Sequence, residues 1–200
     1  MAKKTERLAI RCEQLSQAVV EILANDGRGA LTREKISEVA GLSRPLIYYY
    51  FNSAEAVMAS AFKWICGRIL ELEEKALDGP AAGLDRLAAA FVPDGEESRK
   101  LYRAFFALLP EAVIKDELKG EVSRLRARRR DLLAEVLLDS ARTGEVRPAD
   151  GCDLDAVAGL LEGAALRSAV EAITESKYAN NIGDAVRRYL RPMRVAAVAA

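Results

Sequence analysis

The chain has 200 residues, of which 30 are basic, 30 are acidic and none is histidine, and half of its residues are hydrophobic. This composition is typical of a globular protein with an ordinary core and excludes a long disordered tract. The zero net charge also excludes a broad basic field as the basis of nucleic-acid binding.

The three cysteines, Cys12, Cys66 and Cys152, are far apart and form no Cys-x-x-Cys pair. We therefore expect reduced thiols and neither a metal site nor another cofactor. The chain shows no charged-then-apolar signal sequence, and no apolar run approaches the roughly 18 residues that cross a bilayer. The sequence thus predicts a cytoplasmic protein without a membrane partner.

Apolar residues recur at helical spacing along nearly the whole chain, and no alternating strand pattern is found. The sequence therefore predicts an all-α fold of about nine helices. The first carries an apolar stripe from Leu8 to Leu23, and Thr32 is expected to cap a short second helix that Gly41 ends. Ser43 and Pro45 suit the start of a third helix, which runs to about residue 50.

Six further helices are expected downstream, and their lengths suit a helical bundle. They cover residues 54–77, 84–92, 98–115 with a break at Pro110, 117–143, 153–176 and 184–193. The predicted domain boundary lies between a helix-turn-helix module at 1–53 and a ligand-binding and dimerisation bundle at 54–200.

Residues 31–57 combine a short amphipathic helix, a glycine-containing turn and a second short helix, which is the spacing of a helix-turn-helix. Such a pair lets the second helix project its exposed N-terminal side chains into a major groove about 12 Å wide. Ile36, Val39, Leu42 and Ile47 are expected to hold the pair together. Residues 1–53 carry eight basic and six acidic side chains, so the placement of a few groups has to supply phosphate binding.

The segment SRPLIYYYFNSAE, Ser43 to Glu55, resembles the N-terminal DNA-binding module of TetR-family regulators. In that module a Tyr-x-Tyr-Phe stretch is followed by Asn or Ser and an acidic residue. The match covers residues 8 to about 62, and beyond them only the number, lengths and order of helices resemble the family. The resemblance implies a homodimeric transcriptional repressor that a small-molecule effector releases from a palindromic double-stranded DNA operator.

The resemblance also implies roles for single residues of the motif. Arg44 and Pro45 are expected nearest the base edges, and Arg33, Ser43, Tyr48 and Tyr49 are expected to position the module on the phosphates. An arginine can bind two acceptors on guanine, which is worth about 1–3 kcal/mol of discrimination, so Arg44 is the predicted specificity residue. For Tyr50 and Phe51 the expectation is packing on the core.

One position departs from the family pattern. Ala54 stands where the family usually has a lysine that contacts phosphate at the start of the fourth helix. Lys3, Lys4 and Arg7 could replace that contact from the N-terminus, and the alternative for these three residues is a solvated tail.

The resemblance assigns the effector to the middle helices, and seven side chains could line its pocket: Trp64, Arg68, Tyr102, Phe105, Phe106, Leu109 and Arg129. An aromatic stripe at helical spacing is more often plain core. Arg129 stands where an apolar residue is due, and an inward arginine requires an anion. The alternative, which we favour, is a solvated face of arginines over residues 124–130.

The last two predicted helices resemble the pair that forms a four-helix dimer interface in the family. The expected interface residues are Leu154, Val157, Leu161, Ala165, Val186, Tyr189 and Leu190. Gly159 and Gly163 lie on adjacent turns of one helix face, which would let another helix approach closely.

Two other classes of protein are alternatives to a DNA-binding regulator. An enzyme is disfavoured because the sequence has no histidine, no cluster of metal ligands, no phosphate-binding glycine loop and no nucleophile beside a recognisable base. A helical ligand carrier or interaction protein without DNA binding is the main alternative. The predicted exposure of Arg44, Tyr48 and Tyr49 argues against it.

Overall fold

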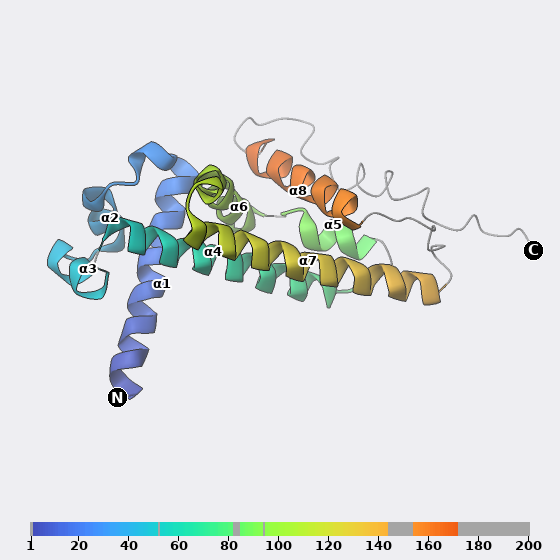
Figure 1. Cartoon of the computed structure of the whole chain (residues 1–200), viewed down its shortest axis with the longest axis horizontal. Coiled ribbons are helices and arrows are strands. Elements are labelled where there is room, and N and C mark those ends of the chain that lie inside the picture. Colours follow the sequence, from blue (N-terminus) through green and yellow to red (C-terminus); the bar gives the residue numbers. More distant parts are fainter. Residues whose placement is uncertain (1, 52, 82–84, 94, 144–153, 172–200) are drawn as a thin grey trace, which may run out of the picture. The chain divides into compact units, whose positions relative to one another are not determined.

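The computed structural model describes residues 2–51, 53–81, 85–93, 95–143 and 154–171. Within these ranges all regular structure is helical, which confirms the predicted all-α class (Figure 1). The helices are α1 (Ala2–Asn25), η1 (Arg28–Ala30), α2 (Arg33–Ala40), α3 (Arg44–Tyr50), α4 (Ala54–Leu77), α5 (Asp85–Phe91), α6 (Glu96–Leu108), η2 (Leu109–Val113), α7 (Asp116–Arg142) and α8 (Leu154–Glu171), where η marks a 3-10 helix. The helix predicted over 184–193 lies outside the described residues.

The boundaries follow from local chemistry. α6 ends at Leu108, and Pro110 lies in the 3-10 segment η2, so the predicted break occurs at the proline, which has no N–H for the helical ladder. Ser53 caps α4 by accepting a hydrogen bond from the backbone N–H of Ala56 at 3.1 Å. No helix among the described residues is long and apolar enough to cross a membrane.

The chain divides into two compact units. The first comprises Met1–Ile69 with Lys100–Arg124, and the second comprises Leu70–Arg99 with the described part of Leu125–Ala200. α4 and α7 each continue from one unit into the other. The first compact unit continues past the predicted domain boundary between residues 53 and 54 and includes the first part of α4. That boundary therefore stays a prediction.

The core of the first unit contains the aromatic residues of α6. The rings of Phe62 and Phe105 stack with centroids 5.7 Å apart, and Phe105 is only 1% exposed. Tyr102 is buried as well, at 2% exposure, and its ring contacts that of Phe106. For Tyr102 and Phe105 the structure therefore agrees with the core alternative to pocket lining.

The other pocket candidates of the first unit are less enclosed. Trp64, Arg68, Phe106 and Leu109 are half-buried. Their role in binding an effector stays a prediction.

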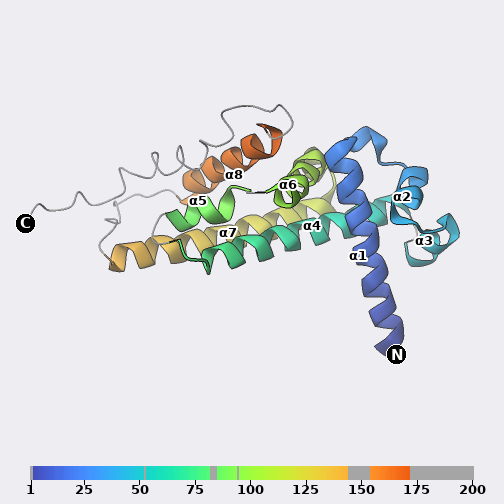
Figure 2. The same ribbon diagram turned by 180° about the vertical axis from the view of Figure 1, so that it is seen from behind.

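In the second unit α8 packs against α5, and Figure 2 shows the two helices side by side from behind. Val157 and Leu161 of α8 join a buried cluster with side chains of α4, α5 and α7, among them Leu87 and Leu133. Ala165 is 1% exposed. These three residues were expected in a dimer interface, and the structure corrects that assignment, because the chain's own helices already cover their side chains.

The opposite side of α8 is open. Gly159, Gly163 and Leu166 are exposed, with Leu166 at 43%. The side chain of Leu154 and the residues Val186, Tyr189 and Leu190, also predicted for the interface, lie outside the described part of the chain.

Arg129 corrects the expectation of a solvated arginine face. Its guanidinium group donates from Nε and Nη2 to Glu73 Oε1 at 3.0 and 2.5 Å, and from Nε to Oε2 at 3.1 Å. The two side chains are 8% and 1% exposed. The arginine thus points inward, as its place in the apolar stripe indicated, and Glu73 supplies the anion that it requires.

The other arginines of this stretch behave as expected for a solvated face. Arg124, Arg126 and Arg128 are at least 41% exposed, and each forms an ion pair with a glutamate at the surface. Among the arginines of this stretch whose ion pairs are described, only Arg129 is buried.

The second unit also contains a polar cleft of about 530 Å³. Four carboxylates and two guanidinium groups line it together with three apolar side chains: Glu74, Asp78, Glu135, Asp139, Arg86, Arg128, Leu77, Leu132 and Val136. Two of the carboxylates pair with Arg128, at 2.9 and 3.6 Å, and Arg86 pairs with a third at 3.4 Å. The volume of the cleft lies within the range of small-molecule sites.

Candidate nucleic-acid interface

The helix-turn-helix begins with a capped α2. The Thr32 side chain accepts a hydrogen bond from the backbone N–H of Lys35 at 3.2 Å, which confirms the predicted cap. Gly41 ends the helix in the left-handed conformation, with φ of 62°, where a glycine carries no steric penalty. The following turn is closed by two hydrogen bonds between Ser37 and Leu42, at 3.1 and 2.6 Å.

α3 begins directly after this turn. Ser43 occupies the N-cap position with an extended backbone, but its side chain makes no capping hydrogen bond, so the prediction was right about the position and wrong about the bond. Pro45 lies in the first turn, where its missing N–H costs little. The helix ends at Tyr50, and the N–H of the C-cap residue Phe51 donates to the Ile47 carbonyl at 2.8 Å.

The two helices pack through the residues that the sequence indicated, with one exception. Ile36 and Leu42 are 4% and 6% exposed, and Ile47 is half-buried. Val39 is the exception because it is 39% exposed. The side chain of Gln14 in α1 adds a hydrogen bond to the carbonyl oxygen of Ala40 at 2.7 Å, which satisfies a terminal carbonyl of α2.

Every predicted DNA-contacting side chain that the structure describes is exposed. Tyr48 and Tyr49 are 44% and 67% exposed, whereas Phe51 is 9% exposed and packs inward. Tyr50 is half-buried and meets Tyr49 edge to face. We call the exposed set the α2–α3 surface; its members are Arg33, Glu34, Ser43, Arg44, Pro45, Tyr48 and Tyr49.

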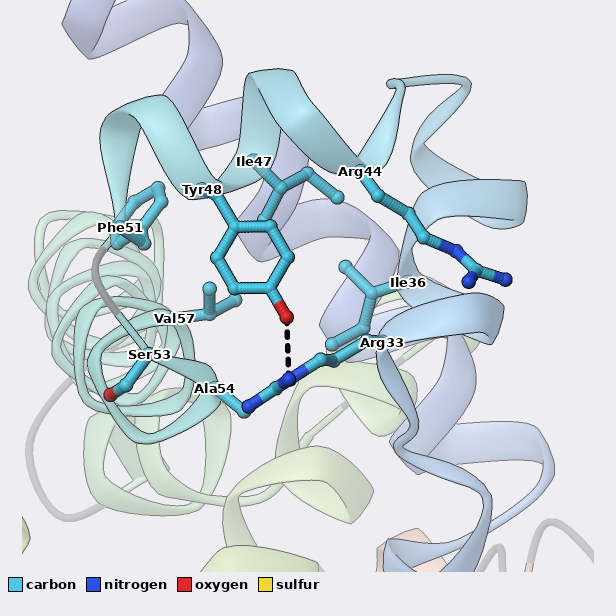
Figure 3. Close-up of a pocket in the computed structure, with 9 residues that line it drawn as sticks. All are labelled: Arg33, Ile36, Arg44, Ile47, Tyr48, Phe51, Ser53, Ala54 and Val57. Atoms are coloured by element: carbon cyan, nitrogen blue, oxygen red, sulfur yellow. Dashed lines mark hydrogen bonds between the residues drawn. The ribbon is translucent and has the colours of Figure 1, made fainter.

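Arg33 crosses from α2 to α3. Its guanidinium group donates to the Tyr48 hydroxyl, and its Cζ atom lies 5.3 Å from the centre of the Tyr48 ring (Figure 3). Arg33 and Ala54 line the same small hollow. A fixed cation therefore lies beside the position where the expected lysine is missing.

Arg44 pairs with Glu34, the residue that follows Arg33 in α2. Its Nη1 lies 3.3 Å from Oε1 of Glu34, and both side chains are more than half exposed, at 58% and 62%. Adjacent residues of α2 thus contact α3 at two points, Arg33 at Tyr48 and Glu34 at Arg44.

The start of α4 carries a carboxylate of its own. The backbone N–H of Glu55 and the Ser53 hydroxyl lower the pKa of the Glu55 side chain by hydrogen bonding to it. Glu55 is therefore ionised at neutral pH and occupies the positive end of the helix.

Three basic residues precede the described side chains of α1. Lys3, Lys4 and Arg7 lie on the α1 backbone, and their side chains are outside the described part. The described residues contain no group of three or more His, Cys, Asp or Glu side chains that could hold a metal.

A family model described as the C-terminal part of BetI-type transcriptional repressors matches residues 80–193, which is more than half of the chain. The chain belongs to the TetR family of transcriptional regulators. This TetR-family regulator is 32% identical over 75 residues to the fatty acid metabolism regulator protein of Bacillus subtilis (strain 168). The match spans 38% of this chain and 39% of that protein.

Solved structures resemble the regulator over nearly its whole length. A TetR transcription regulator from Haloarcula marismortui has a TM-score of 0.76 at 16% identity, covering 94% of this chain and 100% of that one. A regulator from Saccharomonospora viridis in complex with choline has a TM-score of 0.79 at 14% identity, covering 94% and 99%. A Bacillus subtilis regulator in complex with stearoyl-CoA has a TM-score of 0.59 at 20% identity, covering 87% and 96%. These likenesses show the TetR-like fold.

Sequence reasoning missed two residues that contact this TetR-family helix-turn-helix from within it or from α1. Glu34 was not singled out, because an acidic residue in the first turn of a helix is ordinary. Its spacing of ten residues from Arg44 carries no pattern, since a turn separates them. Gln14 lies on another helix, and nothing in the sequence pairs it with Ala40.

Proposed function

We propose that this regulator is a sequence-specific, homodimeric DNA-binding repressor that acts in the cytoplasm on a palindromic operator. The observation that carries the proposal is the exposure of Arg44, Tyr48 and Tyr49 on a short helix whose other side is packed against α2. Exposed aromatic and basic groups at the start of a second helix suit insertion into the major groove.

Arg44 and Pro45 are the proposed base-contacting residues. Arg44 is the first residue of α3 and more than half exposed, so its guanidinium group can reach the edge of a guanine. Pro45 follows it and offers an apolar surface. Arg33, Ser43, Tyr48 and Tyr49 surround this pair and are proposed to bind phosphate and fix the register.

Arg33 is the proposed replacement for the missing lysine. It shares a hollow with Ala54, and its hydrogen bond to Tyr48 reduces the conformational freedom lost on binding. Lys3, Lys4 and Arg7 remain further proposed contacts.

A second copy of the chain would supply the other half-site. One α2–α3 surface has few cations. In a dimer, two such surfaces about 34 Å apart would fit successive major grooves. We propose that the exposed side of α8, with Gly159, Gly163 and Leu166, contacts the second copy together with the C-terminal residues Val186, Tyr189 and Leu190.

A small-molecule effector is proposed to control this binding. Two structural neighbours hold choline and stearoyl-CoA, which share neither size nor charge, so the likeness favours no chemical class. The cleft of about 530 Å³ in the second unit is the proposed effector site because its volume suits a small molecule. An effector acts by binding the two conformations of the repressor with different affinities.

Two experiments test the proposal. Selection from random duplexes, followed by fluorescence anisotropy at fixed salt, should give an operator that binds at least about a thousandfold more tightly than a scrambled duplex. Equal affinity for both duplexes would refute sequence-specific binding. A thermal-shift screen of small metabolites should find a compound that raises the melting temperature, since a ligand of the folded state stabilises it.

A further inference from the structure

The contact between Glu34 and Arg44 lies in the middle of the proposed DNA-binding surface. Glu34 belongs to the first turn of α2, Arg44 is the first residue of α3, and their side chains meet at 3.3 Å. The neighbouring Arg33 holds Tyr48 from the same turn of α2. Two of the exposed α3 residues that are proposed to bind DNA, Tyr48 and Arg44, are therefore contacted by adjacent residues of α2.

The pair contributes little to folding. Both side chains are more than half exposed, and exposed ion pairs add little to stability because water and salt screen them. The carboxylate also repels phosphate, so it weakens the electrostatic attraction on which all DNA binding depends. A carboxylate in the first turn of α2 does interact favourably with the positive end of the helix, but at an exposed site this interaction is weak. Overall affinity for DNA does not account for a glutamate at this position.

We propose that Glu34 is a specificity-determining residue that acts through Arg44. This inference rests on the proposed function. By pairing with one edge of the guanidinium group, Glu34 orients the other edge, with its N–H groups, toward the two acceptors of a guanine. On a sequence without that guanine, Arg44 can reach only phosphate, and there it competes with the carboxylate that already holds it.

Glu34 thus acts on the wrong sequences more than on the right one. On the operator, two hydrogen bonds to the base compensate for the nearby negative charge. On other DNA no base contact does so, and binding is weaker than it would be without Glu34. Specificity gained by penalising the wrong partner is common in recognition surfaces.

The test compares Glu34→Gln with the unsubstituted full-length protein. The probes are the operator obtained by selection and a scrambled duplex of the same composition, measured by anisotropy at one salt concentration. We expect affinity for the scrambled duplex to rise about threefold, and the ratio of operator to scrambled affinity to fall about fivefold. Unchanged melting temperature would show that the variant is folded.

Glu38→Gln is the matched control. Glu38 is an exposed carboxylate one turn further along α2, and its removal changes the net charge by the same amount. This control should raise both affinities by the same factor and leave their ratio unchanged. In the Arg44→Ala background, Glu34→Gln should also leave the ratio unchanged, because the group it orients is absent.

The inference is overturned if Glu34→Gln behaves as Glu38→Gln does, or if it lowers the ratio equally with and without Arg44. Failure of the proposed function has a different signature. In that case the unsubstituted protein itself would not distinguish the operator from the scrambled duplex, which overturns both proposals.

Discussion

Two arginine–glutamate pairs of this chain lie in opposite surroundings. Arg129 and Glu73 are 8% and 1% exposed within the core of the second unit, whereas Arg44 and Glu34 are 58% and 62% exposed on the α2–α3 surface. The chemical groups are the same, but the first pair is shielded from solvent and the second is open to it. Burial therefore makes the first pair a matter of stability and leaves the second free to act in recognition.

The largest effect is expected from breaking the buried pair. Glu73→Gln leaves the guanidinium charge of Arg129 in the core without its carboxylate, which should lower the free energy of unfolding by about 3 kcal/mol. Urea denaturation at neutral pH measures it. Glu74→Gln is the matched control, because Glu74 pairs with Arg128 at an exposed site, and its cost should stay below about 1 kcal/mol. Equal losses in the two variants would contradict the role assigned to burial.

The exposed pair should show the reverse pattern. Arg44→Ala should leave the melting temperature unchanged and reduce discrimination between operator and scrambled duplex by about 2 kcal/mol, since the bidentate contact to guanine is lost. Anisotropy with both duplexes measures the change. Arg126→Ala removes an arginine of nearly equal exposure, 59%, from the second unit and should leave discrimination intact. A comparable loss in that control would exclude a specific role for Arg44.

The sequence predicted the first region better than the second, and the reason is distance along the chain. Thr32, Gly41 and Pro45 act on the backbone within a few residues of themselves, so the capped α2, the turn and α3 could be predicted from the local pattern. Arg129 and Glu73 are 56 residues apart, and no local pattern connects them. The apolar stripe indicated an inward position for residue 129 but not the group that would neutralise it, and the solvated face was favoured instead.

The same limit explains the correction in α8. Helical spacing identified Val157, Leu161 and Ala165 as one apolar face, and that face is indeed buried. Periodicity gives the buried side of a helix but not what covers it. Here α5 and the other helices of the second unit cover this face. The side chains that were expected to contact a partner chain therefore pack in the chain's own core.

A third variant separates the two functions within the α2–α3 surface. Arg33→Ala should weaken binding to the operator and to the scrambled duplex equally, by about 1 kcal/mol each, because a phosphate contact carries no sequence information. Loss of one phosphate contact should also reduce the slope of log affinity against log salt by about 1. Adding Ala54→Lys in that background should restore the slope if both side chains serve the same phosphate. A slope that stays low would show that Arg33 does not replace the missing lysine.

The smallest effect is expected at an ion pair of intermediate exposure within the first unit. Lys100 and Glu21 meet at 2.9 Å with side chains 31% and 46% exposed, and the hydrogen bond from Lys100 lowers the pKa of Glu21 below its ordinary value of 4.5. A lowered carboxyl pKa stabilises the fold above that ordinary value, and this stabilisation is lost as the pH falls through the folded-state pKa.

Lys100→Met should therefore lower the free energy of unfolding at pH 7 by less than about 1 kcal/mol, because solvent screens the pair. The difference from the unsubstituted protein should shrink as the pH falls below the ordinary pKa of Glu21, when the carboxylate is protonated in both proteins. Urea denaturation across this pH range measures it, with Lys63→Met as the control for loss of an exposed lysine from the same unit. A difference that does not depend on pH would mean that the lysine stabilises through its alkyl chain. In that case the electrostatic contributions of the Arg129–Glu73, Lys100–Glu21 and Arg44–Glu34 pairs would not follow the exposure of their side chains.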